Sequence, residues 1–162
     1  MAITWESLNV IFSLIQTVVI VLTIGFAILE IKQLRRSHKL EVFVKLFDEL
    51  SSPVARKNRV FIYSLKNKKP SELTTDDFLV IDEVLSSLDR AWILVQHEQI
   101  DEKFLYDVYG VIFLKIWSVV EPIVIHERKR RGDYYRKRAE SLVCDVKNYF
   151  KQQSLPLEYP IK

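Results

Sequence analysis

Glycine and proline are scarce in this sequence, with only three and five among its 162 residues. Sandwiches and barrels need many tight turns, and these two residue types supply most such turns. Nearly half of the residues are nonetheless apolar, which is enough to bury a core. The composition therefore predicts an all-α protein rather than a sandwich or a barrel.

Cysteine and histidine are also few. Cys144 is the single cysteine, so the chain cannot form an internal disulfide or a thiolate metal site. The three histidines lack the spacing of a zinc site, and the sequence contains no glycine-rich phosphate loop. We therefore expect no metal and no cofactor, and no small-molecule substrate is evident. A non-catalytic protein is favoured over an enzyme.

Charge is absent from a long N-terminal segment. The 23 residues between Glu6 and Glu30 are uncharged, and as a helix they would extend about 34 Å, enough to cross a hydrocarbon core of about 30 Å. Lys and Arg follow this segment but do not precede it, so the positive-inside rule predicts an external N-terminus and a cytoplasmic remainder. We predict a transmembrane anchor over 1–31, a cytoplasmic α-helical bundle over 32–153 and a tail over 154–162.

Polar and small residues follow one face of the anchor. Steps of four and three connect the members of this polar seam: Asn9, Ser13, Gln16, Ile20, Thr23 and Ala27. An unpartnered Gln16 side chain is costly in lipid, so the seam predicts contact with other copies of the chain or with a water-filled lumen. The alternative is a lone anchor that tolerates Gln16, since Ser and Thr can bond to their own helix.

The rest of the sequence predicts four further helices. Ser52 and Pro53 suit the start of a helix, as do Thr75 and Asp101, and Gly132 suits a helix end. We expect helices over 53–65, from 75 to at least 95, over 101–131 and over 133–153. The third of these is apolar nearly all round, but charged residues interrupt it, so we place it at the centre of the bundle or in a subunit contact rather than in a second span.

Arg90 and His97 lie seven steps apart, which brings them to nearly the same face of a helix. This spacing resembles the signature of the HEPN ribonucleases, helical proteins that pair Arg and His at an RNA phosphate. The resemblance implies proton transfer by His97 and charge stabilisation by Arg90. The alternative is a structural pair, with Arg90 bound to an acid such as Asp89 or Glu83 and His97 at a frayed helix end.

A basic run lies between His126 and Arg138. It holds seven cationic residues against two acids, with two tyrosines between its halves. Its members are Arg128, Lys129, Arg130, Arg131, Arg136, Lys137 and Arg138. Such a run can bind RNA by stacking and charge, bind anionic lipid headgroups, or form a solvated helix end with no partner.

Two longer stretches carry a family resemblance: "FVKLFDELSSPVARKNRVFIYSL" and "LSSLDRAWILVQHEQIDEKFLYDVYGVIFLKIWSVVEPIVIHERKRRGDYY". With the N-terminal span, they resemble a bacterial family of small single-pass membrane proteins catalogued only as a domain of unknown function. The layout is also similar to that of membrane accessory proteins of RNA-targeting CRISPR systems. That second similarity implies a divergent HEPN-like domain and ring assembly into a pore.

These observations predict a protein of the bacterial inner membrane that forms homo-oligomers, as a pore-like effector or accessory protein in antiviral defence. One alternative is a membrane-tethered HEPN-like ribonuclease. Another is a tethered adaptor that binds RNA or a cytoplasmic protein through the basic run.

Overall fold

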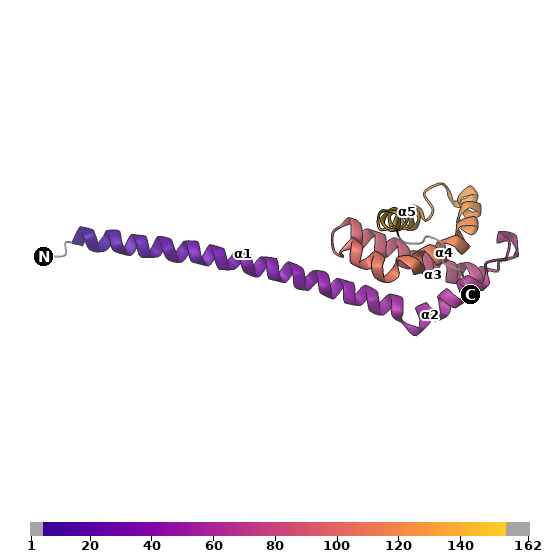
Figure 1. The fold of residues 1–162 in the computed structure, drawn as a ribbon, viewed down its shortest axis with the longest axis horizontal. Coiled ribbons are helices and arrows are strands. Elements are labelled where there is room, and N and C mark those ends of the chain that lie inside the picture. The colour runs from indigo at the N-terminus through magenta and orange to yellow at the C-terminus, as the bar shows by residue number, and fades with distance from the viewer. Residues whose placement is uncertain (1–4, 155–162) are drawn as a thin grey trace. The chain divides into compact units, whose positions relative to one another are not determined.

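The structure is a computed structural model that describes Trp5 and residues 12–154 in full and residues 6–11 by their backbone alone. Its elements are α1 (Trp5–Ser51), α2 (Pro53–Ser64), the short 3₁₀ helix η1 (Pro70–Glu72), α3 (Thr75–Gln96), α4 (Glu102–Arg131) and α5 (Lys137–Gln152) (Figure 1). No strand occurs in this described part, which confirms the predicted all-α class. The predicted tail, apart from Ser154, lies outside the described residues.

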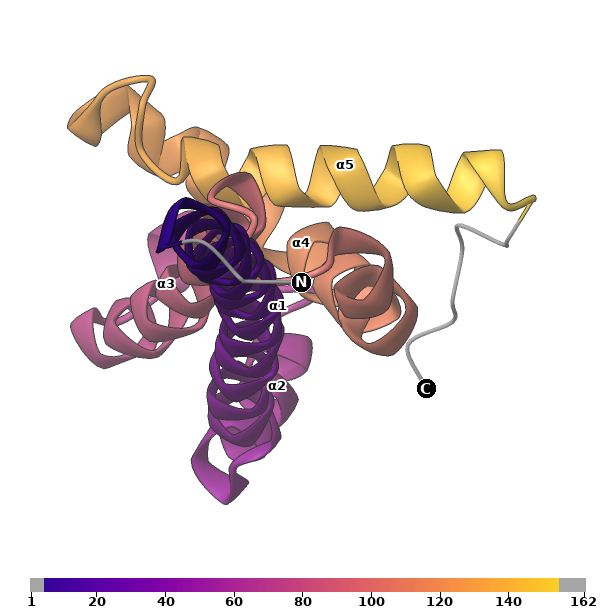
Figure 2. The same ribbon diagram turned by 90° about the vertical axis from the view of Figure 1, so that its left-hand side faces the viewer.

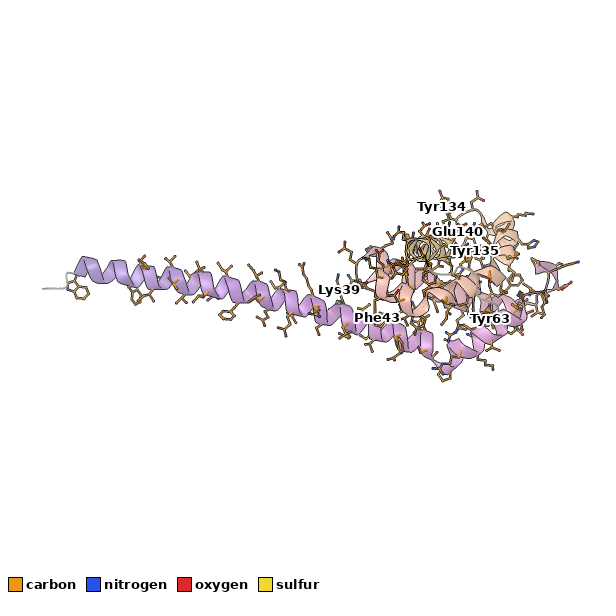
Figure 3. All side chains as sticks on the ribbon, viewed as in Figure 1. Lys39, Phe43, Tyr63, Tyr134, Tyr135 and Glu140 are labelled. Carbon is orange, nitrogen blue, oxygen red and sulfur yellow. The ribbon has the colours of Figure 1, made fainter. Side chains whose placement is uncertain are left out.

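The chain divides into two compact units, Met1–Glu41 and Val42–Lys162. In the N-terminal unit, every side chain described from Phe12 onward is exposed, and these side chains stand out along the helix (Figure 3). The helical segment that begins at Phe12 is long and apolar enough to cross a membrane. This agrees with the predicted anchor in length and composition.

The second unit contains the core. Figure 2 shows α5 lying across α3 and α4, and these two helices make most of its contacts. Four apolar residues of α5 are buried against these helices: Leu142, Val143, Val146 and Phe150. On α3 the row from Ile81 to Leu88 is buried, while Phe78 and Trp92 at its flanks are half-buried.

Helix α4 supplies more of the core than any other helix. Its apolar residues from Leu105 to Val124 are mostly buried, which places it at the centre of the unit, as predicted, although it too is long and apolar enough to span a membrane. Gly110 allows α5 to approach closely. A Cβ at this position would lie 2.9 Å from Cζ of Phe150, closer than real Cβ contacts, and 3.0 Å from Cγ1 of Val146, which is tighter than most of them.

Local chemistry accounts for most helix ends. The Ser52 hydroxyl accepts a hydrogen bond from the Ala55 amide at 3.1 Å, and Pro53 follows at the first helical position. Thr74 and Asp77 form a reciprocal capping box at the start of α3. Gly132 ends α4 with a φ of 95°, a value that other residues rarely adopt.

The predicted start of the last helix is wrong. The sequence suggested a continuous helix from residue 133, but residues 133–136 form a turn and α5 begins at Lys137. Arg136 occupies the N-cap position with a left-handed backbone, φ 55°, and its side chain does not cap the helix. The reason is that the Arg136 side chain is bound to α3 through Asp82 and Asp89.

Candidate functional site

The corner between α4 and α5 is formed by the basic run. Arg136 reaches back to α3, where its Nη1 donates to Oδ2 of Asp89 at 2.8 Å and to Oγ of Ser86 at 3.0 Å. Its Nη2 donates to Oδ1 of Asp82 at 2.8 Å and to the Asp82 carbonyl oxygen at 3.0 Å. The three α3 partners stand four and three residues apart and so share one helix face. Arg136 therefore binds α3 through four hydrogen bonds from one guanidinium.

Asp89 has a second role at this corner. Its Oδ1 accepts a hydrogen bond from the backbone amide of Ala139 at 2.8 Å. That amide lies in the first turn of α5, where helix amides have no partner within the helix. Asp89 thus caps α5 from another helix, which the N-cap residue Arg136 cannot do with its own side chain.

Asp82 collects a third set of contacts. The Tyr135 hydroxyl donates to its Oδ1 at 2.6 Å, and Nη1 of Arg131 approaches its Oδ2 at 3.3 Å. Burial alone would raise the pKa of Asp82, but hydrogen bonds from Tyr135 and Arg136 and the charges of Arg136 and Arg131 outweigh it, so its pKa is lowered. At neutral pH the Asp82 carboxylate is therefore ionised, and both of its oxygens accept hydrogen bonds from within the protein.

Glu127 is the only buried charged residue among those the structure describes. Its Oε2 accepts hydrogen bonds from Nη2 of Arg130 at 2.6 Å and Nε of Arg131 at 2.8 Å. Burial opposes its ionisation, but these two arginines outweigh burial and lower the pKa of Glu127. The Arg131 guanidinium also lies 4.8 Å from the centre of the Tyr135 ring.

The outer part of the corner is a second ion-paired group. Glu140 on α5 accepts hydrogen bonds from Nζ of Lys137 at 2.6 Å and from Nη2 of Arg128 at 3.1 Å. Those two hydrogen bonds, in that order of effect, lower the pKa of Glu140. Nε of Arg128 also donates to the Tyr135 carbonyl at 3.0 Å. Tyr134, Tyr135 and Glu140 are labelled at this corner in Figure 3.

Most of the basic run is therefore paired inside the protein. Of its seven cationic residues, five form ion pairs with acids of the bundle, whereas Lys129 and Arg138 form none with any residue that the structure describes. Tyr134 is almost fully exposed. A role in binding RNA, lipid or a protein stays a prediction for this run, and the cations available for it are fewer than the sequence suggests.

Arg90 is exposed on α3, and His97, which is also exposed, is the C-cap residue that follows the helix. Arg90 pairs with Glu49 on α1, which also accepts a hydrogen bond from the Ser87 hydroxyl at 3.2 Å. Arg90 thus binds an acid, as the structural alternative expects, but the acid is Glu49 rather than Asp89 or Glu83. Asp89 holds Arg136, and Glu83 accepts its hydrogen bond from α2. A catalytic role for the Arg90 and His97 pair stays a prediction.

In the polar seam, Ser13, Gln16, Ile20, Thr23 and Ala27 are all exposed, while the side chain of Asn9 lies outside the described residues. Thr23 donates to the carbonyl of Val19 at 2.8 Å and is satisfied by its own helix. Gln16 makes no hydrogen bond with any described residue. Among the seam residues whose side chains the structure describes, Gln16 therefore carries a carboxamide without a partner.

A family model described as a domain of unknown function, DUF4760, matches residues 17–145. The chain belongs to the DUF4760 family. No curated protein and no solved structure matches it. In this DUF4760 member the matched residues include the whole Asp82, Asp89 and Arg136 contact, but they begin one residue after Gln16.

Metal binding has no support in the described geometry of this DUF4760 member. Among the side chains that the structure describes, those of Trp5 and residues 12–154, no group of three His, Cys, Asp or Glu is arranged to hold a metal ion. Sequence reasoning also missed a pocket between α2, α3 and α4, whose lining includes Arg90. Its signal in the sequence is a set of small residues, Ser52, Ala55, Ser86 and Ser87, at positions that large side chains would otherwise fill.

Proposed function

We propose that this protein is a single-pass protein of the bacterial inner membrane, with its N-terminus outside and its bundle in the cytoplasm, and that it forms homo-oligomers through the polar seam. The observation that carries the proposal is the exposed apolar surface of α1 over residues 12–31, together with the unpartnered Gln16 on that surface.

The exposed apolar surface of this segment is too large to be stable in contact with water. Thirteen large apolar side chains of this segment are exposed: Phe12, Leu14, Ile15, Val18, Val19, Ile20, Val21, Leu22, Ile24, Phe26, Ile28, Leu29 and Ile31. At about 1.5 kcal/mol or more for each side chain, moving them from water into an apolar phase is favourable by on the order of 20 kcal/mol. A lipid bilayer offers that phase, and its thickness matches the length of the segment.

Gln16 supports self-association within the bilayer. The hydroxyls of Thr17 and Thr23 bond to carbonyls of their own helix at 2.9 Å and 2.8 Å, so they need no other partner. The Gln16 carboxamide has two N–H donors and a carbonyl acceptor, and none of them is used by the described chain. In a bilayer, the same group on a second copy would satisfy it, at about 0.6 to 2 kcal/mol per hydrogen bond.

The orientation is supported by charge. Lys and Arg occur at five positions shortly after the span, namely Lys32, Arg35, Arg36, Lys39 and Lys45, and at none before it. Positively charged flanks stay on the cytoplasmic side. The bundle, which follows those residues, is therefore assigned to the cytoplasm.

The mass of the detergent-solubilised protein tests self-association. Native mass spectrometry or light scattering should give a defined oligomer for the wild type and a smaller or looser one for Gln16→Leu. Thr17→Val is the matched control, because its hydroxyl already has a partner in its own helix. A monomer at all concentrations, or an oligomer equally stable in Gln16→Leu, would count against the seam as the interface.

A finer proposal is that the assembly is a pore-like effector or accessory protein in antiviral defence. Its support is the resemblance in layout to the membrane accessory proteins of RNA-targeting CRISPR systems. Conductance across a planar bilayer, compared between the wild type and Gln16→Leu, tests it. An oligomer that conducts no ions would be consistent with the proposed self-association but would refute the proposed pore.

A further inference from the structure

The pocket in the second unit has a volume of about 260 Å³ and lies where the last turn of α1 meets α2, α3 and α4. Part of its lining is apolar and buried, with Leu88, Phe113 and Ile116 among the contributors. The polar side chains that line it are exposed or half-buried, so they form its open side. Its construction is therefore that of a small-molecule site, apolar inside with a few polar groups.

Small side chains keep this pocket open. Ser52, Ala55, Ser86 and Ser87 all line it. Ser52 caps α2, Ser86 accepts a bond from Arg136, and Ser87 donates to Glu49. The Ala55 side chain makes no hydrogen bond of this kind, and a larger apolar side chain at residue 55 would fill the pocket. The pocket is therefore open because residue 55 is small, and one substitution at this residue can close it.

The polar side chains of the pocket have both hydrogen-bond donors and hydrogen-bond acceptors that are not used within the described residues. Asn58 donates through Nδ2 to Oε2 of Glu83 at 3.0 Å, which leaves the other Glu83 carboxylate oxygen and the Asn58 carbonyl oxygen without a donor among the described residues. Arg59 donates to the Leu50 carbonyl and Arg90 to Glu49. A guanidinium has five N–H donors, so both arginines retain several.

Charge at the pocket is balanced. Glu49 and Glu83 supply two carboxylates, and Arg59 and Arg90 supply two guanidinium groups. A simple cation would be attracted by the acids and repelled by the arginines, and a simple anion would meet the reverse. A head group that carries both charges can pair with both kinds of side chain.

We propose that this pocket binds a small zwitterion with an apolar body, of the class of the apolar α-amino acids. The ammonium group would bind Glu83 and Asn58, and the carboxylate would bind the free N–H groups of Arg59 and Arg90. An apolar cavity of about 150 Å³ accommodates benzene, so 260 Å³ accommodates a ring with a short head group. The inference does not depend on membrane insertion or self-association.

Ligand-observed NMR on the full-length protein in detergent tests the proposal, with empty micelles as the blank. The probes are L-phenylalanine, phenethylamine, which lacks the carboxylate, and 3-phenylpropanoate, which lacks the ammonium group. We expect saturable binding of L-phenylalanine and at least tenfold weaker binding of the other two. Binding of L-phenylalanine no stronger than to empty micelles, or equal binding of all three probes, overturns the proposal.

Three variants locate the site. Ala55→Leu fills the pocket and should abolish binding of L-phenylalanine, and Glu83→Gln should weaken it by about tenfold, since a charged acceptor is lost. Glu121→Gln is the matched control, because Glu121 is exposed on α4, outside the pocket, and should bind as the wild type does. If thermal melting shows that Ala55→Leu is misfolded, Glu83→Gln decides. Unchanged binding in folded Ala55→Leu, or in Glu83→Gln, refutes the assignment.

Discussion

Replacement of Arg136 by methionine tests whether the basic run is structural. Methionine keeps much of the length of the side chain and removes the charge and every donor. Both residues are unbranched at Cβ, so the left-handed backbone at this position costs similar energy in each. The substitution therefore removes the four hydrogen bonds to Asp82, Ser86 and Asp89, together with the contact between the guanidinium and the Tyr135 ring.

The magnitude follows from the burial of the three charged groups. The side chain of Arg136 is 15% exposed, and those of Asp82 and Asp89 are 29% and 20% exposed. Breaking a fully buried pair costs about 3 to 5 kcal/mol, because a charge is left without its partner. In the Arg136→Met variant, Asp82 retains its hydrogen bond from Tyr135, and Asp89 retains its hydrogen bond from the amide of Ala139. We therefore expect the free energy of unfolding to fall by about 3 kcal/mol, or roughly 10 °C in Tm.

Thermal unfolding of the full-length protein, followed by near-ultraviolet circular dichroism, measures the effect, since this signal depends on the packing of buried aromatic residues. Arg138→Met is the matched control, because Arg138 is exposed, has no described ion pair and should change stability by no more than about 0.5 kcal/mol. Equal melting temperatures for Arg136→Met and Arg138→Met would refute the assignment of Arg136 as a structural residue.

Three further outcomes are expected. The pKa of Asp82 and that of Glu127 are lower in the folded protein than their usual values, so their stabilisation is complete at neutral pH. It begins to be lost as the pH falls through about 4, the usual pKa of a carboxyl group, and is lost further as the pH falls through the lower pKa values of the folded protein. Thermal melts should show that the Tm falls as the pH is lowered below about 5. A Tm that rises as the pH is lowered there would contradict the lowered pKa values of these two residues. Cys144 is exposed and is the single cysteine, so a membrane-impermeant maleimide should label it in permeabilised cells but not in intact spheroplasts. Labelling of intact spheroplasts would reverse the proposed orientation. Gly110→Ala should destabilise the bundle by about 1 to 3 kcal/mol through overpacking, whereas Gly25→Ala, with open space around its Cβ, should leave the melting of the bundle unchanged.

Helix starts and the core faces could be predicted from the sequence because the chemistry that sets them is local. Ser52, Thr75 and Asp101 were assigned to helix starts from capping preferences, and each lies at the start of a helix or just before it. On α3, apolar residues recur in the sequence at steps of three and four, and the centre of that row is buried. Such signals need only a few neighbouring residues.

The contacts of the corner could not be predicted in the same way. Asp89 and Ala139 are 50 residues apart, and Glu49 and Arg90 are 41 apart. Nothing in a local pattern pairs them, because the pairing depends on how α1, α3 and α5 pack. For the same reason the basic run looked unpaired in the sequence, and the start of α5 was placed four residues too early.

The capping of α5 by Asp89 has a consequence for synthesis on the ribosome. Asp89 emerges well before Ala139, so α3 carries the acceptor for an amide that does not yet exist. Helix α5 has 16 residues, a length at which an isolated helix is only marginally stable in water. It therefore gains its first turn only when the corner reaches α3, and the bundle closes after most of the chain has left the exit tunnel. Until then the apolar face of α5 and the faces of α3 and α4 that pack against it are open to solvent, which makes the docking of α5 decisive for the yield of folded protein.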